Sequence, residues 1–326
     1  MSEGVSRNAS TRVVSLLPSA TEMVHFAGAR DSVVGVTHEC DYPPGVEELP
    51  KLTRSKIGDG NDSATPSLTS AEIDAAVSAL SDEGSIYALD ASLLQRLAPD
   101  LVIAQGLCEV CAVSMGVVEV AVSGMDRAPE VLSLNPTSLR DVLDDAVRIG
   151  EAVGNSEQAR TKVAALEERL TRVEDMVAGL PHPRVGCIEW IDPPFSAGHW
   201  VPEMVGLAGG EDVLAGPGEP SVRLKWDAVF EAAPEVLILM PCGFDVVRTA
   251  REARALYEIP GWEDLPAVRE GRVWAVDANS YFSRPAPRLV NGVEILARIL
   301  HPEAFPDPPR REDARRLQRV RADHVW

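Results

Sequence analysis

The first part of the chain alternates between a short apolar run and an amphipathic stretch. Residues 12–17 (RVVSLL) are a β-branched run that ends at Pro18, and Ser19 and Glu22 have the spacing of a helix capping box. A second strand-like run covers residues 32–37. The pattern predicts strand, tight turn, helix and strand, a βαβ unit in which Ser19 caps the helix.

One pattern of helix end, proline, acid and buried strand occurs twice. Residues 97–105 read LAPDLVIAQ, residues 232–240 read AAPEVLILM, and a cysteine follows each within three residues, Cys108 and Cys242. Proline favours a helix end because the residue before it avoids the α region, and the apolar run is typical of a strand buried on both faces. The recurrence indicates two similar half-molecules.

The segment between β-branched runs in the first half has weaker signals. Residues 43–70 are rich in proline and polar residues and are predicted to be a surface excursion. Thr69 and Glu72 repeat the capping-box spacing before a helix that reaches Leu80, and residues 91–97 are predicted to form another helix.

Two helical segments, residues 137–150 and 156–179, separate the halves, and the second would span about 35 Å at about 1.5 Å per residue. We therefore expect an α/β fold of two Rossmann-like lobes with parallel-rich sheets, residues 12–136 and 181–300. A long interlobe helix within residues 137–180 would join them. Residues 301–326 are rich in proline, arginine and aspartate and are expected to be a loosely attached tail.

The composition of the chain limits the classes of partner that it can bind. A net charge of −19 repels nucleic acid and anionic membrane surfaces. The sequence contains no run of about 18 apolar residues, so direct membrane insertion is not predicted. Residues 1–10 contain no apolar signal region, so the sequence as written predicts a cytoplasmic location, and an upstream start would make it periplasmic or extracytoplasmic. Five cysteines fit reduced thiols better than a disulfide framework.

Candidate ligand contacts follow from the rule that parallel α/β lobes bind ligands at the carboxyl ends of their strands. The aromatic residues among them suit stacking on a large flat ligand or packing of the lobe itself. Candidates in the first lobe are Pro18, Ser19, Glu39, Asp41, Gln105 and Glu109. Candidates in the second lobe are Trp190, Phe195, His199, Trp200, Cys242, Tyr281, Phe282 and Arg284.

The Cys and His residues allow more than one chemistry. His38, Cys40, Cys108 and Cys111 have the residue types of a metal site, although no spacing matches a zinc finger; structural or ligand-contacting thiols and a Cys108–Cys111 redox pair are the alternatives. His199 is a candidate axial ligand to a metal-centred molecule or a hydrogen-bonded loop histidine. No nucleophile elbow, P-loop or dinucleotide fingerprint is present, so a non-catalytic protein is favoured over an enzyme that would use the first-lobe Cys and Glu residues.

Residues 14–22 (VSLLPSATE), the long central helix and the late PEVLI strand together resemble the helical-backbone class (class III) of substrate-binding proteins, over residues 12–300. Residues 38–43 (HECDYP) and 107–112 (LCEVCA) resemble its cobalamin-binding branch. The resemblance implies a ligand held between lobe edges by a monomer with little hinge motion. It implies cobalamin or a related corrinoid as the small-molecule ligand and an ABC permease as the partner. Binding of an iron-siderophore or haem, or a cytoplasmic metal-binding or metal-sensing role, are the alternatives.

Overall fold

A computed structural model describes residues 11–57, 68–80, 86–106 and 112–317, which divide into two compact units. The first unit holds the described residues up to Leu68, Ala75–Pro136 and Asp141–Ala164. The second unit holds Thr69–Asp74, Thr137–Arg140 and the described residues from Ala165 onward.

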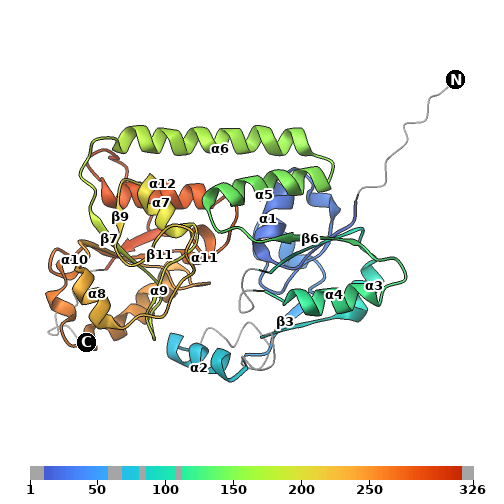
Figure 1. Ribbon diagram of the computed structural model, residues 1–326, viewed down its shortest axis with the longest axis horizontal. Helices are drawn as coiled ribbons and strands as arrows, with labels where there is room; N and C mark the ends of the chain where they lie inside the picture. The colour runs from blue at the N-terminus through green and yellow to red at the C-terminus, as the bar shows by residue number, and fades with distance from the viewer. Residues whose placement is uncertain (1–10, 58–67, 81–85, 107–111, 318–326) are drawn as a thin grey trace. The chain divides into compact units, whose positions relative to one another are not determined.

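The first unit is built on a parallel sheet of order β2-β1-β5-β6. Its strands are β1 (Val13–Ser15), β2 (Val33–Gly35), β5 (Leu101–Gln105) and β6 (Glu130–Leu134). Figure 1 shows α1 and α5 on one side of this sheet and α3 and α4 on the other. These helices are α1 (Pro18–Phe26), α3 (Ala91–Leu97), α4 (Met115–Ser123) and α5 (Leu139–Ala152). Because both faces are covered, β1 and β5 are buried along their whole length, as their apolar sequences predict.

The opening βαβ unit is confirmed, but the predicted helix cap is wrong. Leu17 is the N-cap of α1, with an extended backbone and no capping side chain, and Pro18 is the first helical residue. Proline favours this position because its missing N–H would have no partner there and its φ suits a helix. Ser19 therefore lies inside the first turn, where it is buried.

The excursion between β2 and α3 carries more structure than its composition predicts. Within the predicted residues 43–70 it holds β3 (Thr53–Ser55), which pairs antiparallel with β4 (Tyr87–Leu89). The helix predicted to reach Leu80 is confirmed as α2 (Ser70–Leu80). The capping box of α2 is confirmed, because Thr69 N donates to Glu72 Oε2 at 2.8 Å and Glu72 N donates to Thr69 Oγ1 at 3.3 Å.

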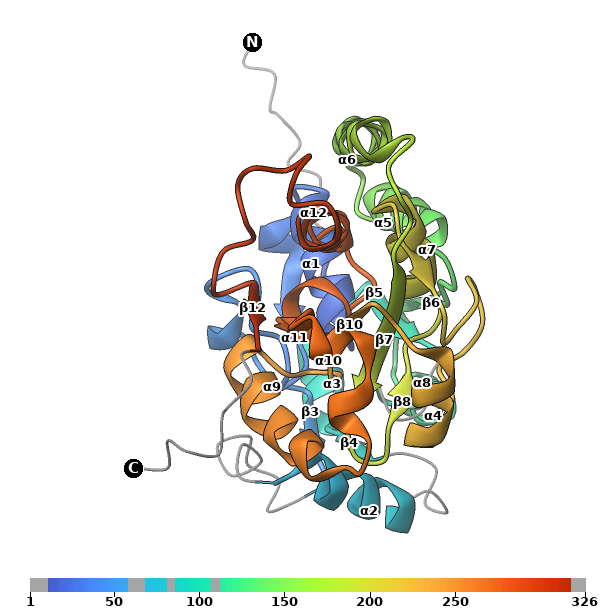
Figure 2. The same ribbon diagram turned by 90° about the vertical axis from the view of Figure 1, so that its left-hand side faces the viewer.

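The second unit has a sheet of order β12-β11-β10-β7-β8, with β9 also paired to β7. The strands β7 (Arg184–Trp190), β10 (Val236–Leu239) and β11 (Val273–Val276) are parallel, and β9 (Glu211–Asp212) joins β7 in parallel. Figures 1 and 2 place α7 (Val201–Leu207) and α12 (Leu289–Leu300) on one side of the sheet. On the other side lie α8 (Trp226–Ala232), α9 (Val246–Glu252) and α10 (Pro266–Arg269). The predicted fold class, α/β with a parallel-rich sheet in each half, is confirmed.

The repeated Pro-acid pattern has the same backbone in both units. Ala98 ends α3 with φ +41° and Ala233 ends α8 with φ +44°, and both stand immediately before a proline. A residue before proline is disfavoured in the right-handed helical region, so each helix ends in a left-handed residue before the chain enters a buried strand.

The long helix is α6 (Ser156–Val177), and the division between the two units falls within it, after Ala164. Among the described residues, no helix combines the length and apolar character that crossing a membrane requires.

The described part of the predicted tail is attached rather than loose. His301 is 2% exposed, and its Nε2 lies 3.1 Å from the carbonyl oxygen of Gly209. Further on, β12 (Ala314–Arg316) pairs antiparallel with β11 and adds an edge strand to the second sheet. The prediction was wrong because one buried histidine and a three-residue edge strand leave almost no apolar pattern in a polar segment.

Candidate functional site

The aromatic residues predicted for the ligand site follow the parallel strands of the second unit. Trp190 ends β7 and is half-buried, with its ring 5.4 Å from that of Phe244, which follows β10. The indole Nε1 of Trp190 donates to the carbonyl oxygen of Ser70 at 3.1 Å. A half-buried, hydrogen-bonded indole can lie against a flat ligand without first having to be ordered.

Residues at the start of α2 hold this part of the site. Ser70 N donates to Glu252 Oε2 at 3.1 Å, so the carboxylate of Glu252 satisfies an otherwise open donor of the helix N-terminus. Asp74 accepts two bonds from Arg223 Nη2, at 2.9 and 3.0 Å. These contacts explain why Thr69–Asp74 belongs to the second unit although its neighbours in sequence belong to the first.

Phe195 lies in β8 (Phe195–Ser196) beside this cluster. It is partly buried, and the guanidinium of Arg223 lies 5.4 Å from the centre of its ring. Arg223 therefore contacts an aromatic face and a carboxylate at once, which fixes the orientation of its planar group.

His199 has a backbone that few side chains adopt. Its φ is +54°, and its N–H donates to the carbonyl oxygen of Glu219 at 2.6 Å while its own carbonyl accepts from Gly218 N at 2.9 Å. Burial lowers the pKa of the imidazole, so the ring is neutral at pH 7. A neutral imidazole has a free lone pair for a metal-centred ligand.

Two of the predicted aromatic contacts are interior residues. Trp200 is 7% exposed and donates from Nε1 to the carbonyl oxygen of Phe282 at 2.8 Å. Phe282 itself is 2% exposed. Their rings pack within the second unit, and the hydrogen bond joins the loop after β8 to the loop after β11.

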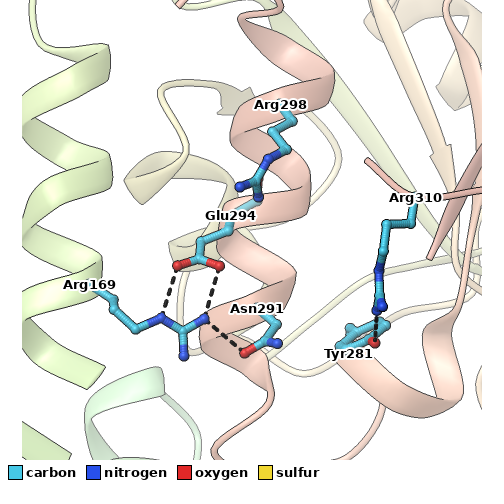
Figure 3. Close-up of polar contacts among 6 residues, drawn as sticks. All are labelled: Arg169, Tyr281, Asn291, Glu294, Arg298 and Arg310. Atoms are coloured by element: carbon cyan, nitrogen blue, oxygen red, sulfur yellow. Dashed lines mark hydrogen bonds and ion pairs between the residues drawn. The ribbon is translucent and has the colours of Figure 1, made fainter. Parts of the chain in front are cut away.

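The remaining second-unit candidates differ in exposure. Cys242 is exposed, and its backbone N–H donates to the carbonyl oxygen of Glu189 at 3.0 Å. Tyr281 is half-buried, and burial together with Asp313 raises the pKa of its phenol to about 12, so the hydroxyl stays protonated. Figure 3 shows Arg310 Nη2 directed at this hydroxyl, at 3.5 Å. Arg284 is partly buried.

Three ionisable residues of the second unit were not foreseen. Burial raises the pKa of Glu189 to about 7, although bonds from Ser221 and the backbone of Gly198 favour its charged form. Burial also raises the pKa of Asp212 to about 6 and that of the Cys187 thiol, which faces it. Glu189 could have been noticed as the one acid in the strand RVGCIEW, whereas Asp212 follows no apolar pattern.

The candidates of the first unit are mostly held by protein contacts. Ser19 and Gln105 are buried, and Pro18 is partly buried at the start of α1. Glu39 accepts a bond from the Tyr87 hydroxyl at 3.0 Å, and Asp41 is exposed. Glu109 lies outside the described residues.

The predicted metal site finds no support in the described part of the chain. Cys40 is buried, with its sulfur 3.2 Å from the hydroxyls of both Thr21 and Thr37, and His38 Nδ1 lies 2.7 Å from Thr53 Oγ1. No group of three or more His, Cys, Asp or Glu residues suited to a metal occurs among residues 11–57, 68–80, 86–106 and 112–317. Cys108 and Cys111, the other two predicted ligands, lie outside these ranges.

A family model described as periplasmic binding protein matches residues 13–279. The chain is 25% identical over 302 residues to an uncharacterized ABC transporter substrate-binding lipoprotein of Bacillus subtilis, covering 90% of this chain and 81% of that protein. A periplasmic vitamin B12 binding protein of Vibrio cholerae has the same fold, with a TM-score of 0.65 and 22% identity over 90% of this chain and 98% of that one. A periplasmic heme-binding protein of Roseiflexus sp. RS-1 gives a TM-score of 0.64 and 24% identity, over 91% and 100%.

These similarities confirm one expectation from the sequence and contradict another. Members of this family are substrate-binding proteins of transporters and not enzymes, so the expectation of a non-catalytic protein is confirmed. The expected cytoplasmic location is wrong, because the similar proteins are periplasmic proteins or lipoproteins, which points to an extracytoplasmic location. The matched region covers both units and most of their sheets, and this chain belongs to the periplasmic binding protein family.

Proposed function

We propose that this protein binds cobalamin or a related corrinoid and delivers it to the permease of an ABC importer. The proposal is supported by the family match together with the half-buried aromatic rings at the carboxyl ends of the second unit's strands. Trp190 is the observation that carries it, because the hydrogen bond from its indole Nε1 to the carbonyl oxygen of Ser70 fixes the orientation of the ring. A corrinoid is a large flat ring, and such rings bind well to preorganised aromatic faces.

The polar residues are assigned to two parts of the corrinoid, its cobalt and the amide side chains at the edge of its ring. His199 offers a neutral imidazole, which suits the axial position of a corrinoid cobalt. In the first unit, Asp41 is exposed and Glu39 is partly exposed, and carboxylate oxygens of this kind accept hydrogen bonds from amide groups such as those of a corrinoid's side chains. Buried Ser19, in the first turn of α1, and Gln105, at the end of β5, are assigned to packing within the first unit.

Titration with cobalamin tests the proposal, with corrinoid absorbance and tryptophan fluorescence recorded together. We expect saturable binding at micromolar concentrations and quenched fluorescence. Affinity should be about 5- to 150-fold weaker in Trp190→Leu, since stacking on an indole contributes about 1–3 kcal/mol. Trp226→Leu is the matched control, because Trp226, the first residue of α8, packs edge-on against Trp262 and is not a candidate ligand contact. The proposal fails if neither signal responds, or if both variants lose affinity equally.

Haem is the second candidate, favoured by the same neutral His199. Imidazole nitrogen is a common axial ligand of haem iron. Adding haem in place of cobalamin would then shift the Soret band of the porphyrin, and His199→Ala would abolish the shift. If cobalamin binds and haem does not, the second candidate is excluded; the reverse result would replace the first candidate with the second.

A further inference from the structure

A cavity lies within the second unit, away from the strand-end loops. Its volume is about 270 Å³, close to the lower end of small-molecule sites at about 300 Å³. Its walls come from the second half of α6, from α12, and from residues 305–307, which follow α12. None of the candidate ligand contacts lines it, so it is separate from the site of the proposed function.

An ion pair between the two helices forms the fixed part of this cavity. Arg169 on α6 donates from Nε and Nη2 to the two carboxylate oxygens of Glu294 on α12, both at 2.9 Å, and Nη2 also donates to Asn291 Oδ1 at 3.0 Å (Figure 3). Both charged side chains are about one-quarter exposed. A bidentate pair of this kind sets the spacing and register of α6 and α12 at the cavity.

Two further guanidinium groups of the cavity have no carboxylate partner among the described residues. Arg172 is exposed on α6, one turn beyond Arg169, and makes no hydrogen bond or ion pair there. Arg298 donates only to the backbone carbonyl of Glu294, at 3.3 Å. The lining contains three arginines and two acids, Glu294 and Asp307. It therefore carries one net positive charge, in a chain whose net charge is −19.

The rest of the lining is apolar. Val173 and Phe305 are buried, and Pro306 lies beside them on the segment after α12. Met176 is 47% exposed, one of few large hydrophobic side chains of the described chain that solvent reaches so freely. An exposed flexible thioether beside a buried aromatic ring is a surface onto which an apolar group can pack.

We propose that this cavity binds a small organic monocarboxylate with an apolar body. The carboxylate accepts hydrogen bonds from Arg172 and Arg298 and neutralises the net charge of the lining, and the apolar body covers Met176 and Phe305. Guanidinium suits this ligand because its planar donors match the two oxygens of a carboxylate. The bidentate pair of Arg169 and Glu294 keeps the third arginine from competing for the same anion.

Titration calorimetry with benzoate, benzamide and acetate tests the proposal in the full-length protein. We expect benzoate to bind with a dissociation constant below about 1 mM. The neutral benzamide and the small acetate should each bind at least about tenfold more weakly. Arg172→Gln and Arg298→Gln should each weaken benzoate binding about tenfold. Arg311→Gln is the control, because it removes the same charge at an exposed residue that does not line the cavity.

The methyl resonance of Met176 gives the position of the ligand. We expect benzoate to shift it in the wild-type protein and in Arg311→Gln. The proposal is overturned if benzoate fails to bind up to about 20 mM, if benzamide binds equally well, or if Arg311→Gln weakens binding as much as Arg172→Gln does. Cobalamin binding is measured on the same variants and should be unchanged, so failure of this site and failure of the proposed function remain distinguishable.

Discussion

Replacing Glu189 with glutamine should remove a pH dependence from the stability of the protein. Glu189 lies at the end of β7, where burial raises its pKa from 4.5 to about 7. The folded protein therefore binds this proton more tightly than the unfolded chain does. The contribution of Glu189 to the free energy of unfolding is therefore highest below about pH 4.5, falls as pH rises to about 7, and is level above that.

The size of the effect follows from the shift. At about 1.4 kcal/mol per pKa unit, a rise from 4.5 to about 7 corresponds to about 3 kcal/mol. Because part of the side chain is exposed to solvent, we expect about 2 kcal/mol. Glutamine stays neutral and can still accept hydrogen bonds from Ser221 and Gly198, so Glu189→Gln should match the wild type at pH 4.5 and exceed its stability at pH 7.5.

Urea unfolding between pH 4.5 and 8 measures the free energy of unfolding of both proteins. The informative quantity is the difference in this free energy between Glu189→Gln and the wild type at each pH. Asp212, with a pKa raised to about 6, contributes a slope of the same sign in both proteins, and His199 contributes one of opposite sign, so both cancel in the difference. Glu231→Gln, which alters an exposed residue, is the control. A difference that stays constant with pH would refute the reasoning.

Three substitutions test local features of the second unit, each by urea unfolding at pH 7. Ala233→Gly should stabilise the protein by about 0.5–1 kcal/mol, since glycine adopts φ +44° without strain; a loss of stability would contradict the helix-end account. Trp200→Phe should cost about 1–3 kcal/mol, because the buried carbonyl of Phe282 loses its donor; an unchanged midpoint would show that this bond contributes nothing. Gly198→Ala should destabilise by about 2 kcal/mol or more, since its Cβ would lie 2.3 Å from the backbone nitrogen of Ser221; wild-type stability would argue against this close approach.

The fold was predictable where one physical signal dominates. Helix α3 has the bounds that its sequence predicts, and the buried strand predicted after Pro99 is β5. A proline-terminated helix and a buried strand are fixed by backbone sterics and by a local apolar pattern. Strands β3 and β12 could not be foreseen, since each has three residues and is stabilised by pairing with a strand distant in sequence.

The candidate site was predictable only in outline. The rule of strand carboxyl ends located Trp190 and Phe195, but it could not separate them from Trp200 and Phe282, which lie in equivalent loops and point into the core. The contact of Trp190 with Ser70 joins residues 120 positions apart, and no local pattern encodes it. The cytoplasmic location failed because it rested on the first ten residues alone.

Mass spectrometry of the small molecule retained by the protein, purified from its native host and released by denaturation, tests the central claim most directly. The account predicts one corrinoid per chain, with the corresponding absorbance lost on release. Recovery of haem or an iron chelate in its place, or protein that stays empty after incubation with cobalamin, would contradict it.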